Sequence, residues 1–239
     1  MEARDDGWNN SSAQLSEPFI ISFRGRLSRM TEYRKRCCRK GNLTGFQQQW
    51  NGNYKWGAVV MFRYVVDDEI YLAMLERRHA QEFFNLIVDS ADYIGAWLPF
   101  AKHTKTVEDT LAFIETTLHG FAAGREVNAG IWYQDELVGT IGLHINRSNQ
   151  SASIGYWIGQ AYEGRGIMTR SCRALITYAF GELALHRIEI RANMGNIRSR
   201  AIPERLGFQQ EGIIREAFKL YDEFNDSVVY GLLDREWPR

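Results

Sequence analysis

The chain has 239 residues, with 29 Lys or Arg and 29 Asp or Glu, so its formal net charge is zero. Its three cysteines show no Cys-x-x-Cys spacing, and no apolar run is long enough to span a bilayer. These features argue against a disulfide-built secreted domain and against a membrane protein. No signal peptide is evident, so we expect a reduced, soluble, cytoplasmic protein without a membrane partner.

The zero net charge is the sum of two parts of the chain that have opposite net charges. Residues 1–60 hold ten Lys or Arg against five Asp or Glu, whereas the remainder holds 19 against 24. The first part contains a basic run at 34–40 and three glutamines at 47–49 but no sustained periodicity, which is typical of disorder. We expect an N-terminal extension over 1–60 and one domain over 61–239.

Two alternatives stay open for this extension. Either Met61 is the true start of the protein and the extension is a mis-assigned upstream reading, or the basic run is an arm that binds RNA or anionic lipid. No aromatic residues interleave with the basic run, so a nucleic-acid partner is not expected.

Apolar periodicity predicts the elements of the domain in chain order. Two strands, 62–66 and 70–75, flank the turn Asp67-Asp68-Glu69 as a hairpin. Three helices and three strands follow, and Pro99 ends the second helix. The helices are expected at 79–88, 92–98 and 107–123, and the strands at 128–133, 137–145 and 151–158.

The strand at 151–158 runs into the most informative feature, the glycine turn Gly164-Arg165-Gly166, which opens onto a helix from Ile167. The first amides of a helix lack intrahelical partners and, with the helix dipole, form an anion site. The two glycines let a phosphate approach bare backbone, and Arg165 adds a positive charge. The run matches neither a P-loop nor a dinucleotide-binding motif, and by itself it is equally compatible with an ordinary turn.

A second segment reads as a strand, a turn and a short helix. Isoleucines alternate with charged residues over 186–193, Asn196 is a candidate N-cap with Ser199 three residues on, and Gly207 is a C-terminal stop. Two last strands are expected at 211–219 and 226–233.

Together these segments resemble the GNAT acetyltransferase superfamily, and most closely its RimJ/RimL type, the ribosomal-protein N-terminal acetyltransferases and their relatives. The resemblance covers about Met61 to Trp237. It rests on three motifs that occur in the order of the family: Ile154-Gly155-Tyr156-Trp157-Ile158, Tyr162-Glu163-Gly164-Arg165-Gly166-Ile167-Met168-Thr169, and Asn196-x-x-Ser199-Arg200-Ala201-Ile202-Pro203-Glu204-Arg205-Leu206-Gly207-Phe208.

The resemblance implies an α+β fold, in which a central mixed, mostly antiparallel, splayed β-sheet is flanked by helices. It also implies acetyl-CoA as the co-substrate, with pantetheine along the 155–158 strand and pyrophosphate on the glycine turn. Unpaired backbone groups of a diverging strand would hold the amide-rich pantetheine arm as if it were another strand. The residues expected to bind acetyl-CoA are Tyr156, Trp157, Ile158, Gly164, Arg165, Gly166, Ile167, Met168, Thr169, Asn196 and Ser199.

Acetyl transfer to an amine needs a donor for the developing oxyanion and a proton for the departing thiolate. A backbone N–H of residues 156–158 is the expected oxyanion donor. Many family members place a tyrosine four residues before the glycine of the Leu-Gly-Phe turn, but this chain has Pro203 there. RimJ/RimL-type proteins keep a serine at the position of Ser199, so the resemblance makes Ser199 the candidate acid; the alternative is that its hydroxyl only caps the backbone.

At the positions expected to supply the general base, the sequence departs from the family pattern. Relatives often carry a glutamate at the positions of Ser153 or Phe218. Glu216, two residues before Phe218, would face the same side of a regular strand and could supply the carboxylate; the alternative is a surface glutamate paired with Arg215 or Lys219. A peptide α-amine, with a reference pKa of about 7.7 to 8, needs less help from a base than a lysine does.

The expected function is acetyl-CoA-dependent acetylation of a primary amine by direct attack in a ternary complex. A protein or peptide N-terminal α-amine, as on a ribosomal protein, is the favoured acceptor. A small-molecule amine (a polyamine, an amino acid or an antibiotic) and a non-catalytic acyl-CoA-binding regulatory module are the alternatives. No metal is expected, because no histidine pair has metal-ligand spacing, and a homodimer is one of the oligomeric states left open.

Overall fold

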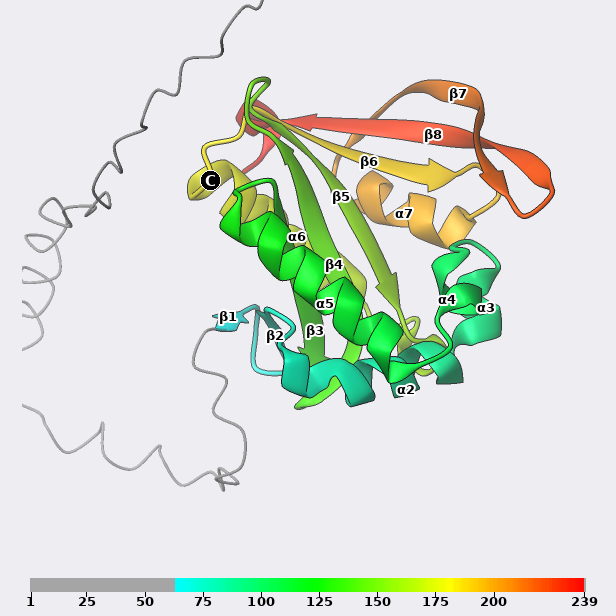
Figure 1. The fold of residues 1–239 in the computed structure, drawn as a ribbon. Coiled ribbons are helices and arrows are strands. Elements are labelled where there is room, and N and C mark those ends of the chain that lie inside the picture. The colour runs from blue at the N-terminus through cyan, green and yellow to red at the C-terminus, as the bar shows by residue number, and fades with distance from the viewer. Residues whose placement is uncertain (1–62, 239) are drawn as a thin grey trace, which may run out of the picture. The chain divides into compact units, whose positions relative to one another are not determined.

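The computed structural model describes residues 63–238, and the predictions for the extension over 1–60 lie outside them. The described strands form one sheet in the order β1-β2-β3-β4-β5-β6-β8-β7. Only β5 and β6 are parallel neighbours, so the predicted mixed, mostly antiparallel sheet is confirmed (Figure 1). The strands are β1 (Arg63–Val65), β2 (Ile70–Ala73), β3 (Glu126–Tyr133), β4 (Glu136–Asn146), β5 (Ser151–Ile158), β6 (Arg187–Asn193), β7 (Gln209–Leu220) and β8 (Glu223–Leu233).

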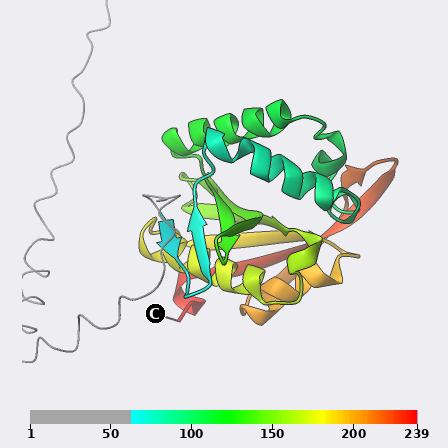
Figure 2. The same cartoon turned by 90° about the horizontal axis from the view of Figure 1, so that it is seen from below.

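Helices cover both faces of the sheet (Figure 2). Helices α2 and α5 pack on one face around Trp132 and Leu137, and α6 packs on the other face in the larger core. The helices are α2 (Ala80–Asp89), α3 (Ala91–Gly95), α4 (Phe100–His103), α5 (Val107–Ala122), α6 (Ile167–Gly181) and α7 (Ile197–Arg205). The sequence therefore predicted both the type and the order of these elements, apart from the division around Pro99.

Pro99 separates two short helices. The expected helix over 92–98 ends already at Gly95, and Pro99 is the N-cap of α4. Proline suits the start of a helix because its fixed φ is near-helical and its missing N–H would have no intrahelical partner there. The prediction located the break but not the helix that follows it.

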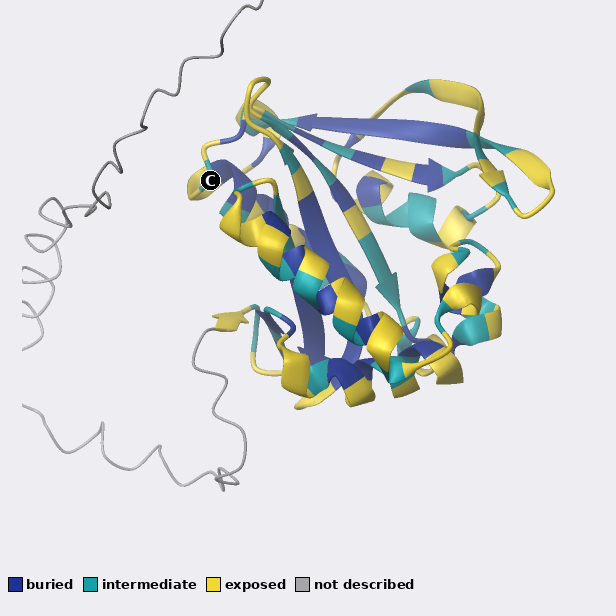
Figure 3. Cartoon of the chain, viewed as in Figure 1, coloured by how far each residue is buried: buried dark blue, intermediate teal, exposed yellow. Residues whose placement is uncertain are grey.

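The apolar stripe of α6 is buried as its spacing predicts. Figure 3 shows that β4 is buried over most of its length, whereas β7 is largely exposed. The α6 stripe packs on the sheet through Ile167, Met168, Cys172, Leu175, Ile176, Ala179 and Phe180, all of them buried. This packing fixes the helix whose N-terminus follows the glycine turn.

The sheet is splayed between β5 and β6. The two strands pair only from Ser151 opposite Arg187 to Ile154 opposite Ile190. Beyond that point β5 pairs with β4 alone and β6 with β8 alone, and the strands visibly diverge (Figure 1). Residues 155–158 therefore keep one edge without a strand partner, as the predicted splay requires.

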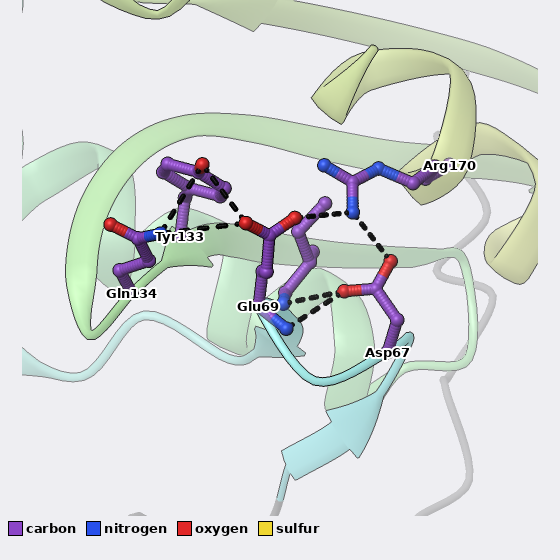
Figure 4. A network of polar contacts seen from close by, with 6 residues as sticks. Asp67, Glu69, Tyr133, Gln134 and Arg170 are labelled. Atoms are coloured by element: carbon purple, nitrogen blue, oxygen red, sulfur yellow. Dashed lines mark hydrogen bonds and ion pairs between the residues drawn. The ribbon is translucent and has the colours of Figure 1, made fainter. Parts of the chain in front are cut away.

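An ionic network ties α6 to the β1–β2 turn (Figure 4). The Arg170 guanidinium lies 2.8 Å from Asp67 Oδ2 and 2.9 Å from Glu69 Oε2. The Tyr133 hydroxyl donates to the other oxygen of Glu69 at 3.2 Å. Because Arg170 lies one turn into α6, the network anchors the end of the helix that adjoins the glycine turn.

Both carboxyls of the network have lowered pKa values. Burial by itself would raise the pKa of Asp67, but hydrogen bonds from the Glu69 amide and from Arg170 outweigh it, and the net pKa is lowered. The hydrogen bond from Arg170 is the main cause of the lowered pKa of Glu69. A carboxyl whose pKa is lower in the folded state stabilises the fold at neutral pH, and this contribution is lost as the pH falls through the folded pKa.

We expect Arg170→Met to lower the Tm at pH 7 by roughly 1 to 3 °C, since partly exposed ion pairs are screened by solvent. The deficit should shrink as the pH falls below about 4, where the carboxyls of the wild type are also protonated. Thermal melts from pH 7 to pH 3 measure both effects, and Arg205→Met, an exposed substitution on α7, is the control. An equal deficit at every pH would show that Arg170 acts through packing and not through its charge.

Candidate functional site

The residues predicted to bind a ligand gather where β5 leaves β6. Gly155 is exposed, and Tyr156, Trp157 and Ile158 are half-buried. The side chains alternate about the strand: Tyr156 packs in the α6 core and Trp157 in the α2–α5 core. The backbone edge between them faces the divergence, so its N–H and C=O groups are available to a ligand.

The glycine turn has the geometry of an anion site. Gly164 and Gly166 both have φ of +71°, a conformation that favours glycine. Apart from the adjacent residues of the chain, no atom lies within 4 Å of a Cβ built at either position, so the turn is open on that side. Gly166 is the N-cap of α6, and no side chain caps the helix there. The first amides of the helix have no partner in its own hydrogen-bond ladder, so they stay free to bind an anion.

Arg165 lies beside this turn. Its guanidinium donates to the Ala161 carbonyl at 3.1 Å and lies over the rings of Tyr162 and Tyr133, 5.6 and 5.9 Å from their centroids. The side chain thus places a positive charge near the turn while its backbone amide stays within it.

The first turn of α7 is capped as the sequence predicts. Asn196 is the N-cap, and its Oδ1 accepts the Ser199 amide at 3.0 Å. Gly207, with φ of +83°, follows the end of this helix, so the predicted C-terminal stop is confirmed. The cap holds Ser199 in a fixed position at the start of the helix.

Tyr156 joins β5 to this turn. Its hydroxyl donates to the Ser199 carbonyl at 3.0 Å, and Ser199 Oγ donates to the Tyr156 hydroxyl oxygen at 3.4 Å. Pro203 has no N–H for the Ser199 carbonyl four residues earlier, and the sequence suggested a loosened backbone there. The phenol supplies the missing donor, so the carbonyl is satisfied.

Burial is the main cause that raises the pKa of Tyr156 far above its ordinary value. The phenol therefore keeps its proton throughout the physiological range and remains a donor to the Ser199 carbonyl. Tyr156 was predicted only as part of the ligand-binding strand; a contact between residues 43 positions apart leaves no local pattern in a sequence.

Glu216 lies in an irregular part of β7. Ile214 pairs with Ser227 and Phe218 with Asn225, so three residues of β7 stand opposite Asp226 alone. Glu216 is exposed, has φ of +50°, and its amide donates to Asp226 Oδ1 at 2.8 Å. The two-residue alternation that would place Glu216 on the side of Phe218 is interrupted here, and the role of its carboxylate stays a prediction.

A polar cluster that the sequence did not reveal lies on the other side of the turn. The carboxylate of Glu163 contacts the Tyr93 hydroxyl through one oxygen and the Arg198 guanidinium, at 2.6 Å, through the other. Glu163 and Arg198 each adjoin a predicted residue, Gly164 and Ser199. Only the fold brings them together.

Two further residues with reactive side chains, Cys172 and His144, lie in surroundings that suit a structural role. Cys172 is fully buried, which raises the pKa of its thiol and disfavours a nucleophilic role. His144 is exposed and lies 3.6 Å from Glu126. Over residues 63–238 no group of three or more His, Cys, Asp or Glu side chains could hold a metal ion, and no helix within that range is long and apolar enough to cross a membrane.

Comparisons with known proteins agree on one family. The model of the acetyltransferase (GNAT) domain matches residues 69–209. YdaF of Bacillus subtilis (strain 168), whose name assigns it provisionally as a ribosomal N-acetyltransferase, is 40% identical over 74% of this chain and 98% of its own. The ribosomal-protein-serine acetyltransferase of Escherichia coli (strain K12) is 26% identical over 69% of this chain and 93% of its own.

A solved structure shares the fold. The microcin C7 self immunity acetyltransferase MccE, in complex with acetyl-CoA and AMP, is 26% identical and superposes with a TM-score of 0.68. The similarity covers 70% of this chain and 94% of MccE.

The Tyr156 contact generates a stability prediction. We expect Tyr156→Phe to lower the free energy of unfolding by about 1 to 2 kcal/mol, because the Ser199 carbonyl loses its donor. In a Pro203→Ala background the same substitution should cost less than half as much, because residue 203 regains an N–H for that carbonyl. Urea unfolding of the four proteins of this double-mutant cycle measures the coupling; equal costs in the two backgrounds would contradict it.

Proposed function

This chain belongs to the GNAT acetyltransferase family and is an N-acetyltransferase, and we propose that its acceptor is the α-amine of a protein or peptide N-terminus. The acetyl donor is acetyl-CoA, the co-substrate of the family. The observation that carries the proposed donor site is the end of the β5–β6 ladder at Ile154, with the glycine turn following in the same segment that leads from β5 to α6.

Each part of the proposed donor site matches a part of acetyl-CoA. The unpaired edge of 155–158 offers alternating donors and acceptors to the amides of the pantetheine arm. The turn at 164–166 and the first amides of α6, at 167–169, would bind the pyrophosphate. Asn196, at the start of α7, would contact the pantetheine in addition to capping the helix.

The reaction needs few protein groups once both substrates are held in place. The neutral amine attacks the thioester carbonyl carbon, a C–N bond forms, and a backbone N–H of 156–158 stabilises the oxyanion. The protonated nitrogen of this tetrahedral intermediate loses a proton to water or to a nearby base, the C–S bond breaks to leave the amide, and the departing thiolate takes a proton. We assign the thiolate proton to Ser199, which is regenerated by exchange with water.

The geometry of Ser199 supports this role. Its donor contact to the Tyr156 hydroxyl is long, at 3.4 Å, and therefore weak. Its amide and carbonyl are both fixed, by Asn196 and Tyr156. The hydroxyl can thus rotate to a sulfur atom without any movement of the backbone.

Two observations support an α-amine as the acceptor. YdaF and the E. coli protein are both named for ribosomal acetylation, and the second for serine. The positions where relatives often carry a glutamate hold Ser153 and Phe218, and an amine with a pKa near 8 depends less on a base than one near 10.4. The similarity to MccE, named for microcin C7 self immunity, favours a small-molecule amine as the second candidate.

The first test is thiol release from acetyl-CoA with a matched acceptor panel. We expect turnover with a peptide that has a free N-terminal serine, and none with the same peptide when its N-terminus is blocked and a lysine is the only amine. Polyamines, amino acids and aminoglycosides complete the panel. Turnover confined to a small molecule would select the second candidate, and binding of acetyl-CoA without thiol release on any acceptor would indicate a binding module.

With the acceptor identified, Ser199→Ala should lower kcat about 100-fold with little change in KM for acetyl-CoA, as loss of a general acid does. Ser199→Thr keeps a hydroxyl and should retain most of the activity. If the alanine variant turns over as fast as wild type, Ser199 only shapes the start of α7.

The predicted base is tested separately. If the Glu216 carboxylate takes the proton of the amine, Glu216→Gln lowers kcat/KM about 10- to 100-fold, most strongly below the pKa of the amine. Glu223→Gln, which neutralises an exposed carboxylate on the paired strand, is the matched control. Equal pH–rate profiles for the two variants would remove Glu216 from the mechanism.

A further inference from the structure

Glu163 connects three segments of the chain. Its carboxylate contacts the hydroxyl of Tyr93, from α3, and the guanidinium of Arg198, from the first turn of α7. Burial and the hydrogen bond to Glu163 raise the pKa of Tyr93, so the phenol stays protonated and acts as the donor. Glu163 itself directly follows the 3-10 turn η2 (Gln160–Tyr162) and directly precedes Gly164.

The two charged partners lie in the segments that follow the diverging strands, Glu163 four residues before α6 and Arg198 in the first turn of α7. Glu163 leads from β5 towards α6, and Arg198 belongs to α7, which follows β6. The 2.6 Å contact between them therefore links the segments after β5 and after β6 past the point where those strands stop pairing. No other ion pair in the described part of the chain joins these two segments.

The exposure of the pair is unequal. The side chain of Glu163 is 23% exposed, whereas that of Arg198 is 75% exposed. A largely buried carboxylate next to an anion-binding turn would repel a phosphate, and the repulsion is stronger where water is excluded. Arg165 does not neutralise the Glu163 carboxylate through an ion pair, because its guanidinium donates to the Ala161 carbonyl.

We propose that Arg198 is a positioning residue of the acetyl-donor site: it neutralises Glu163 and holds the glycine turn against α7, so that the turn can accept the diphosphate of coenzyme A. This inference rests on the proposed donor site and adds two residues to it. The Arg198 guanidinium acts on the glycine turn through its contact with Glu163. Glu163, held by Tyr93, determines where that guanidinium stands.

Coenzyme A binding to the full chain, measured by titration calorimetry without any acceptor, tests this role. We expect Arg198→Ala to raise the Kd about tenfold, because the carboxylate is left unneutralised beside the phosphate. Glu163→Gln in the same protein should restore the Kd to within about threefold of wild type, since glutamine keeps the contact with Tyr93 and removes the charge. Arg205→Ala, at the opposite end of α7, is the matched control and should bind as wild type does.

The outcomes separate this proposal from the proposed function. If wild type binds coenzyme A and Arg198→Ala binds equally well, Arg198 has no role in the donor site. If the double variant remains as weak as Arg198→Ala, charge neutralisation is wrong. If wild type itself does not bind coenzyme A, the proposed donor site fails before Arg198 is in question. In steady-state assays the expected effect lies in KM for acetyl-CoA and not in kcat, which a general loss of folded protein would not produce.

Discussion

The site depends on one interruption of hydrogen bonding, the end of the β5–β6 ladder at Ile154 and Ile190. Both strands continue past that pair, each held on its other edge, β5 by β4 and β6 by β8. Backbone N–H and C=O groups that are shielded from water need hydrogen-bond partners. A ligand with its own amides can supply such partners to residues 155–158 and so complete the sheet. The glycine turn lies in the segment that follows β5, and α7 lies in the segment that follows β6. The divergence of the two strands therefore also separates these two parts of the proposed site.

Contacts outside the ladder fix the elements around this opening, and three of them lie in the described part of the chain. Arg170 anchors α6 to the β1–β2 turn, Tyr156 fastens α7 to β5 through the Ser199 carbonyl, and Arg198 joins α7 to the glycine turn. The second contact also resolves a local conflict. Pro203 lies inside α7, and the carbonyl that it leaves without an intrahelical donor is the one that the buried phenol reaches.

Short-range patterns predicted the local structure of most of the proposed donor site. The alternation over 151–158, the glycine turn and the Asn196 cap depend on neighbours a few residues away, and the structure has them as expected. Contacts that join distant segments could not be found in this way. The β7 irregularity opposite Asp226 is a matter of strand register, which depends on the partner strand, and so the expected direction of the Glu216 side chain rested on a regular strand that is not there. Glu163 and Arg198 were visible as charges but not as partners.

The residues at the positions where the family resemblance leads us to expect a glutamate also bear on the proposed choice of amine. Phe218 is one of them, and its partner across the ladder, Asn225, accepts a hydrogen bond from Asn193 at 2.9 Å. Apolar and neutral polar groups stabilise an ammonium less than a carboxylate does, so they lower the pKa of a bound amine. For an α-amine with a reference pKa near 8, a shift of about one unit makes the reactive neutral form predominate at pH 7.5, whereas a lysine near 10.4 would remain almost fully protonated. A lysine acceptor would therefore depend on a base such as the proposed Glu216 far more than an α-amine would.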